Sequence, residues 1–241
     1  MKKKLRKTAI AFFVGASIAS SLSLLKVGKE NIVGFTAVVL GAGLMIALKD
    51  EDDLNKKSRD YEYFFNRAQD EFEVANYEEA ILDYNKALKL SPTEICLVYS
   101  MRGNAKRNLG DIDGAISDQN KALGFDPLYI DGYFNRSSAK LKKGDFTGAI
   151  DDQNKALDFD PLYADGYFNR SSAKFNMGDF AGAIDDYSQV LRINPMDSDA
   201  YFNRANIKKE IGDLNGACED WIKAVDLRDK EAAKLLKENC E

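Results

Sequence analysis

The feature that most constrains this chain is a repeat of 34 residues. Its only prolines are spaced by that period, with one extra residue in the first interval. They are Pro92, Pro127, Pro161 and Pro195. The blocks that begin at Ile130 and Ala164 share the segments DGYFNRSSAK and GAIDD. A fixed period of roughly 20 to 50 residues is typical of a solenoid, in which each structural unit stacks on its neighbours.

Each block carries the pattern of two short amphipathic helices. In the block from Ile130, small and apolar residues recur at helical spacing on both sides of a Gly144-Asp145 pair. Glycine adopts the left-handed conformation that closes a helix, and aspartate caps the next helix through its carboxylate. The same pair recurs at 110–111, 178–179 and 212–213. The sequence therefore predicts an all-α chain of helix–turn–helix units.

The pattern resembles the tetratricopeptide repeat (TPR). An aromatic residue near the start of each block matches at Phe64, Tyr99, Tyr133, Tyr167 and Tyr201. The alanine at which the two helices cross matches at Ala80, Ala115, Ala149, Ala183 and Ala217. The small residue of the first helix matches at Ala68, Gly103, Ser137, Ser171 and Ala205. The resemblance covers residues 61–231 and implies a right-handed α-solenoid.

We expect five repeats over residues 61–229 and a capping helix over 230–241, because the last repeat would otherwise expose its apolar face. The expected repeats are 61–95, 96–129, 130–163, 164–197 and 198–229. The second-helix aromatic of the family is replaced by Gln119 and Gln153, so these two repeats should be packed slightly less well. Asp229 stands where the fifth repeat should have proline, which leaves open whether its second helix runs on.

The first 48 residues differ from the rest in charge and hydropathy. They hold seven Lys/Arg and one Glu, whereas 49–241 hold 27 Lys/Arg and 38 Asp/Glu. Two apolar stretches, 8–25 and 32–48, are separated by a short polar break. About 20 apolar residues span a bilayer and about 17 is the short limit, so 32–48 is a candidate membrane helix. The stretch 8–25 suits either a second membrane helix or a cleavable signal peptide.

The solenoid is thus expected to follow one or two transmembrane helices in a membrane-anchoring segment, residues 1–48, with 49–60 as a charged linker. Basic residues are more numerous before the first apolar stretch than after it, which places the N-terminus inside. A two-helix hairpin leaves the repeats facing the cytoplasm, as does a cleaved signal followed by one spanning helix. A single spanning segment would place them on the exported side.

Composition argues against several classes of function. The chain has no histidine, the commonest general base and metal ligand. Its three cysteines lack metal-ligand spacing, and we expect no metal, no cofactor and no enzymatic activity. Cys218 and Cys240 would meet if the last two helices pack together, and the sequence leaves their redox state open. The acidic body is a poor partner for nucleic acid.

One charged pair recurs in every repeat. An arginine lies in the first helix where the family usually has leucine, and an aspartate follows sixteen residues later in the second helix. The pairs are Arg67 with Asp83, Arg102 with Asp118, Arg136 with Asp152, Arg170 with Asp186, and Arg204 with Asp220. A partly buried arginine is destabilising without a carboxylate. We therefore predict a structural salt bridge between the two helices of each repeat.

The resemblance also implies a binding face, because first helices in this family line the concave groove of the solenoid. The candidate residues are Asn66, Asn135, Asn169 and Asn203, with Phe134, Phe168 and Phe202 beside them. A carboxamide both donates and accepts hydrogen bonds, so such a row can hold a peptide backbone of any sequence. The same Phe-Asn pair would also serve to pack adjacent repeats, and both interpretations remain open.

These features favour a membrane-anchored scaffold that binds a protein or peptide segment, for example during assembly of a membrane complex. Relatives that bind the acidic tails of chaperones use basic residues around this asparagine, whereas this chain has phenylalanines and Asp131, Asp165 and Asp199. A neutral or basic partner is therefore expected, together with the lipid bilayer. The alternative is an exported TPR protein that acts in envelope biogenesis after its signal peptide is cleaved.

Overall fold

The computed structural model describes residues 53–90 and 94–240, and in that part the chain consists of helices joined by short turns, without strands. The chain divides into two compact units, Met1–Arg59 and Asp60–Glu241. The candidate membrane segments 8–25 and 32–48 lie outside the described residues. Within the described ranges, no helix is both long enough and apolar enough to cross a membrane.

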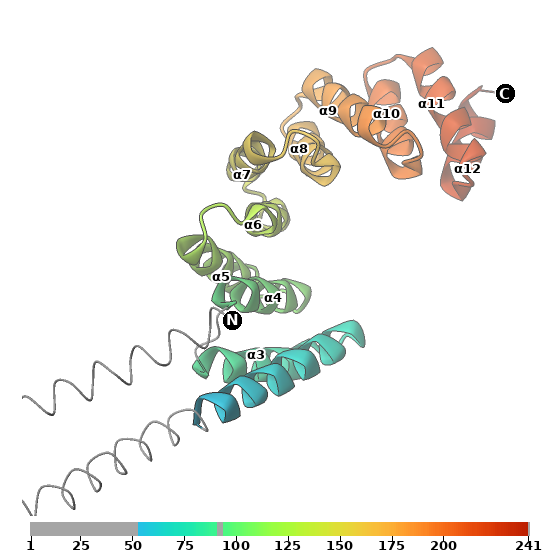
Figure 1. Cartoon of the computed structure of the whole chain (residues 1–241). Coiled ribbons are helices and arrows are strands. Elements are labelled where there is room, and N and C mark those ends of the chain that lie inside the picture. Colours follow the sequence, from blue (N-terminus) through green and yellow to red (C-terminus); the bar gives the residue numbers. More distant parts are fainter. Residues whose placement is uncertain (1–52, 91–93, 241) are drawn as a thin grey trace, which may run out of the picture. The chain divides into compact units, whose positions relative to one another are not determined.

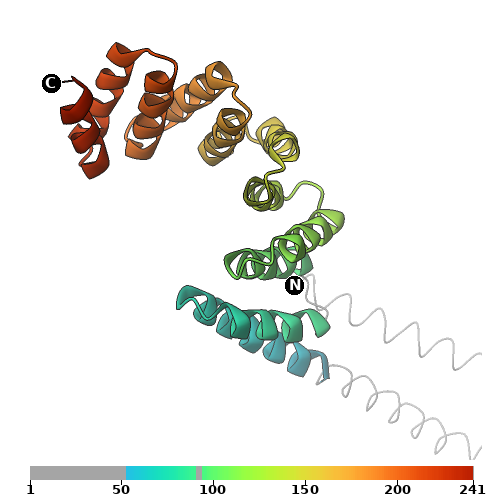
Figure 2. The same cartoon turned by 180° about the vertical axis from the view of Figure 1, so that it is seen from behind.

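The second unit is a series of helices that pack in chain order. Residues 53–73 are helical, including the described part of the expected linker 49–60. The helices that follow are α3 (Tyr77–Lys89), α4 (Ile95–Asn108), α5 (Ile112–Phe125), α6 (Ile130–Lys143), α7 (Phe146–Phe159), α8 (Ala164–Asn176), α9 (Phe180–Ile193), α10 (Ser198–Glu210), α11 (Leu214–Asp226) and α12 (Lys230–Cys240). Each helix from α3 to α12 contacts the next one along the chain, an order that is visible from both sides in Figures 1 and 2.

The turn inside each of the last four repeats is built by a Gly-Asp pair. The four glycines have φ between +81° and +86°, a conformation that strains any residue with a β-carbon. They are Gly110, Gly144, Gly178 and Gly212. The aspartate that follows accepts a hydrogen bond at 3.0 Å from the backbone N–H three residues on. In the first repeat, Ala75 takes the left-handed position with φ 63°, and Asn76 makes no side-chain cap.

The core is made of small residues where helices cross and larger ones between them. The crossing alanines of all five repeats are at most 1% exposed. Around them, the hydroxyl of Ser137 donates to the carbonyl of Ala149 at 3.1 Å, and Ser171 makes the equivalent bond to Ala183 at 2.9 Å. Small side chains let the two helix backbones approach closely, and the serine hydroxyls are satisfied inside that contact.

Gln119 and Gln153 occupy the expected aromatic positions and are completely buried. Gln119 donates from Nε2 to the carbonyl of Ser100 at 3.0 Å, but its Oε1 has no partner. Neither polar atom of the Gln153 carboxamide has a hydrogen-bond partner. An unpaired buried polar group costs about 1–3 kcal/mol. The departure from the family pattern is thus a polar group within the core of two consecutive repeats.

The C-terminal end is closed by α12, which packs against α11. The second helix of the fifth repeat does not run on, since it ends at Asp226 and Arg228 adopts the left-handed conformation with φ 71°. Asp229, in place of the family's proline, accepts from the backbone N–H of Ala232 at 2.9 Å. Ala232 is fully buried, and Leu235 and Leu236 pack against the same cluster as Trp221.

Candidate functional site

The Arg–Asp pairs form a continuous structure that we call the charged seam. In all five repeats the arginine Nη2 donates to the aspartate Oδ1 at 2.6–2.7 Å. The arginine Nε donates to the other carboxylate oxygen, at 2.8–2.9 Å in the last four repeats. The five aspartates are at most 4% exposed. Each pair is therefore a two-point contact between the two helices of one repeat.

Each seam aspartate also meets a lysine, which sequence reasoning did not identify. In the last four repeats the lysine lies one helical turn after the arginine and reaches the carboxylate at 2.8 Å. These residues are Lys106, Lys140, Lys174 and Lys208. In the first repeat Glu71 stands at that position, and Lys86 reaches Asp83 at 2.8 Å from the second helix instead. The sequence does contain a signal that identifies this lysine, because a lysine recurs four residues after the arginine in the last four repeats.

The third guanidinium nitrogen joins the seam to the preceding repeat. Nη1 of Arg102, Arg136 and Arg170 donates to an asparagine Oδ1 on the previous second helix at 2.5–2.7 Å. Arg204 donates to Ser188 Oγ at 2.9 Å in the same way. The acceptors of the first three bonds are Asn85, Asn120 and Asn154. One arginine thus fastens three helices, which only the stacked array brings together.

The electrostatics around Asp118 favour the charged form of its carboxylate. Burial would raise the pKa of Asp118, but hydrogen bonds from Arg102 and Lys106 outweigh burial and hold that pKa below its usual value. Each arginine also lies over the ring of a tyrosine three or four residues earlier on the same helix, 5.2–5.7 Å from the centroid. These contacts hold the helices of each repeat together.

The asparagine row is Asn66, Asn135, Asn169 and Asn203, and its members differ in what they bind. Asn135 donates from Nδ2 to Ser100 Oγ at 3.2 Å, and Asn169 donates to Ser138 Oγ at 3.0 Å. Both bonds connect a first helix to the first helix of the preceding repeat. Asn66 and Asn203 make no side-chain hydrogen bond to another described residue. Two members of the row therefore contribute to the packing between repeats.

The phenylalanines beside this row are also engaged within the array. The Phe134 ring packs edge-on against Tyr163 with centroids 5.8 Å apart, and Phe168 does so against Tyr187 at 5.2 Å. Phe202 packs against the cluster that contains Trp221. All three side chains are partly buried. These three phenylalanines therefore contribute mainly to packing within the array, and only part of each side chain is accessible to a ligand.

The described ranges contain no group of three or more cysteine, aspartate or glutamate side chains placed to hold a metal ion. The carboxylates of Asp131, Asp165 and Asp199 are exposed on the first turns of α6, α8 and α10. Within the described part of the chain none of the three pairs with a lysine or arginine. The first-helix face therefore presents two kinds of polar group: carboxamides with remaining hydrogen-bonding capacity, and carboxylates that pair with no lysine or arginine of the described residues.

Two protein-family models match the chain. The model described as tetratricopeptide repeat matches residues 61–94, 98–127 and 130–161. The model described as TPR repeat matches residues 172–212. Together these matches cover more than half of the 241 residues.

Solved structures with low sequence identity share the fold. MamA from Desulfovibrio magneticus RS-1 (residues 41 to the end) is 17% identical over 70% of this chain and 95% of that chain, with a TM-score of 0.64. YrrB, described as a TPR protein with an unusual peptide-binding site, is 22% identical over 73% of this chain and 90% of that chain, with a TM-score of 0.58.

A curated relative matches a shorter part of the chain. Small glutamine-rich tetratricopeptide repeat-containing protein 2 of Saccharomyces cerevisiae is 33% identical over 87 residues. The match spans 35% of this chain and 23% of the yeast protein.

Proposed function

The chain belongs to the tetratricopeptide-repeat family, and from that premise we propose that it is a non-enzymatic scaffold that binds a peptide segment of another protein on its first-helix face. The observation that carries the proposal is Asn203, whose carboxamide lies in the asparagine row without a side-chain hydrogen bond to any described residue. A carboxamide can pair with both the N–H and the C=O of a peptide group. Asn135 and Asn169 each retain Oδ1 and one N–H after their bond to serine.

The bound segment is neutral or basic. Three exposed carboxylates, Asp131, Asp165 and Asp199, lie one per repeat on the first turns of the first helices. Burial and then the charges of Asp131 and Asp165 raise the pKa of Tyr163, in the loop before α8. An acidic segment would be repelled by them, whereas lysine or arginine side chains would be attracted.

The scaffold is held at a membrane by residues 1–48 and faces the cytoplasm. This part of the proposal rests on the apolar stretches 8–25 and 32–48 and on the excess of basic residues at the start of the chain. A scaffold fixed in this way would assemble proteins at the bilayer surface, because tethering raises the local concentration of whatever it binds.

An exported TPR protein is the second candidate, and the Cys218–Cys240 disulfide favours it. Disulfides persist in oxidising compartments and are rare in the cytosol. In this version the signal peptide is removed and the repeats act outside the cytoplasm in envelope biogenesis. The two candidates share the same binding face and differ in the side of the membrane on which it lies.

The binding face is tested with fluorescent 12-residue peptides of matched length and varied charge, added to the full-length chain in detergent. We expect basic and neutral peptides to bind, and Asn203→Ala to weaken that binding about tenfold without lowering the melting temperature, since one lost hydrogen bond is worth about 1.4 kcal/mol. Asn239→Ala on α12 is the matched control and should bind like the unchanged chain. A preference for acidic peptides, or no effect of Asn203→Ala, would contradict the proposal.

The side of the membrane is tested by N-terminal sequencing of the membrane-bound protein and by protease treatment of intact cells stripped of their outer layers. An intact Met1 with residues 60–241 protected supports the cytoplasmic scaffold. A mature chain that begins after the first apolar stretch and has accessible repeats supports the exported protein.

A further inference from the structure

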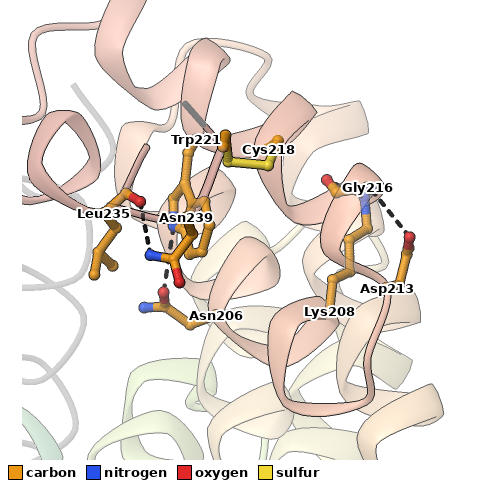
Figure 3. The surroundings of a disulfide bond; sticks show 9 residues. Asn206, Lys208, Asp213, Gly216, Cys218, Trp221, Leu235 and Asn239 are labelled. Atoms are coloured by element: carbon orange, nitrogen blue, oxygen red, sulfur yellow. Dashed lines mark hydrogen bonds between the residues drawn. A yellow bond between two sulfur atoms is a disulfide. The ribbon is translucent and has the colours of Figure 1, made fainter. Parts of the chain in front are cut away.

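Helix α12 is connected to α11 at both of its ends, by the chain itself at its start and by a disulfide at its far end. At its start, the joint between α11 and α12 runs through Arg228, a residue with a β-carbon in the left-handed conformation. At its far end, Cys240 forms a disulfide with Cys218 on α11, with the two Cα atoms 6.0 Å apart. Figure 3 shows this disulfide at Cys218 and, on α12, Asn239 with its hydrogen bond to the carbonyl of Leu235.

The helix itself has little to keep it in place. It contains eleven residues, fewer than the roughly 12–15 that an isolated helix needs to be even marginally stable in water. Only Ala232 is fully buried, while Leu235 and Leu236 are partly buried and most of the remaining side chains are exposed. Its docking on α11 therefore depends strongly on whatever holds its far end.

Beneath α12 lies the most buried large side chain of the C-terminal end. Trp221 is 0% exposed, and it packs with Ala217, Ala224 and Ala232 in a single cluster. Its indole N–H donates to Asn206 Oδ1 at 3.3 Å, so the ring is anchored to α10 and not to α12. If α12 moves away, the ring stays with α10 and α11 and becomes exposed to solvent.

We propose that the Cys218–Cys240 disulfide is a redox latch that keeps α12 closed over Trp221 and releases it on reduction. Cys240 is exposed and Cys218 is partly exposed, so a reductant can reach the bond. A dithiol reductant transfers two electrons and two protons: the sulfur–sulfur bond breaks, both cysteines become thiols, and the reductant becomes a disulfide. Loss of the cross-link lowers the equilibrium ratio of the closed to the open position of α12 by a factor on the order of a hundred.

The release is confined to the end of the array. The joint at Arg228, the cap at Asp229 and the seam of the fifth repeat do not involve the disulfide. The seam pair Arg204–Asp220 links α10 to α11, so these two helices stay together when α12 leaves. The latch therefore exposes an apolar end surface around Trp221 without unfolding the repeats.

The test uses hydrogen–deuterium exchange of the full-length chain, oxidised and then treated with dithiothreitol. We expect reduction to speed the exchange of amides in α12 at least tenfold, to leave α4–α9 unchanged, and to shift the emission of Trp221, the only tryptophan, to longer wavelength. Unchanged exchange in α12, or faster exchange throughout α4–α9, would overturn the latch.

Two variants separate the latch from other thiol effects. Cys218→Ser/Cys240→Ser should resemble the reduced chain under both conditions, and oxidised-like exchange of this variant would overturn the proposal. Cys96→Ser removes the free cysteine and should respond to dithiothreitol like the unchanged chain. Loss of the response in that variant would also overturn the assignment to Cys218 and Cys240.

Discussion

The first and third repeats contain the same Arg–Asp pair but embed it differently. Arg136 has a side chain 15% exposed and is bonded to Asp152 and to Asn120 of the preceding repeat. Arg67 has a side chain 40% exposed and directs the same nitrogen to Tyr63, four residues earlier on its own helix. The aspartate is equally buried in the two repeats, and the arginine is more buried in the repeat where it also bonds to the preceding one.

The two repeats also differ in the turn between their helices and in the core between them. The third repeat has a Gly144-Asp145 turn with a complete side-chain cap, whereas the first has Ala75 in the left-handed conformation and no such cap. In the core, the first repeat has the family's aromatic residue, Tyr84, and the third has the unpaired amide of Gln153. The third repeat thus combines a capped turn with an unpaired buried amide, and the first repeat combines an aromatic core residue with a strained turn.

The largest expected effect comes from breaking the seam in one repeat and then in the other. Asp152→Ala leaves Arg136 and Lys140 without their carboxylate in a buried position, so we expect the free energy of unfolding to fall by about 3–5 kcal/mol. Asp83→Ala should cost about half as much, because water reaches the more exposed Arg67. Urea denaturation of the full-length chain measures both.

The exposed neighbour Asp151 provides the control for the seam. Asp151→Ala should change stability by less than about 0.5 kcal/mol, as expected for a surface position. Equal losses for Asp152→Ala and Asp83→Ala would show that stacking contributes nothing to the pair.

An intermediate effect is expected from removing the buried amide of the third repeat. Gln153→Leu keeps a similar volume and replaces two unpaired polar atoms with apolar ones, so stability should rise by about 2 kcal/mol. Gln119→Leu is the matched variant and should gain less, since it also removes the bond to the Ser100 carbonyl. Thermal unfolding checks the order of the two variants, and a loss of stability for Gln153→Leu would show that its amide is satisfied in solution.

The smallest effect comes from exchanging the turn residues of the two repeats. Ala75→Gly relieves a β-carbon in the left-handed conformation and should stabilise by about 0.5–1 kcal/mol. Gly144→Ala introduces the same strain and should destabilise by about 1 kcal/mol, although no atom beyond the residue itself and its two chain neighbours lies within 4 Å of the new β-carbon. Urea midpoints that move in opposite directions confirm the comparison; midpoints that move together contradict it.

Much of the fold was predictable because it depends on local signals. The Gly-Asp turns and the crossing alanines each act within one repeat, and their recurrence at a fixed period carries the resemblance to a TPR solenoid. The arginine and aspartate of the seam were also visible, since both recur at one fixed separation of sixteen residues.

The remaining parts of the site depend on contacts between repeats. The bonds from arginine to Asn85, Asn120 and Asn154, and from Asn135 and Asn169 to serines, join residues whose distance is set by how one repeat stacks on the next. Periodicity leaves a packing asparagine and a peptide-binding asparagine indistinguishable. Their neighbours separate them, and leave Asn66 and Asn203 as the members without a side-chain hydrogen bond to a described residue.

By itself, the amino-acid sequence determined the helix–turn–helix unit and the charged pair inside it, because helix caps, left-handed glycines and helical periodicity act over a few residues. The tertiary structure decided which polar groups form hydrogen bonds within the array and which do not. It also decided that Cys218 and Cys240 meet. Both outcomes require two helices to pack at one particular register, and that register follows from the burial of many side chains at once.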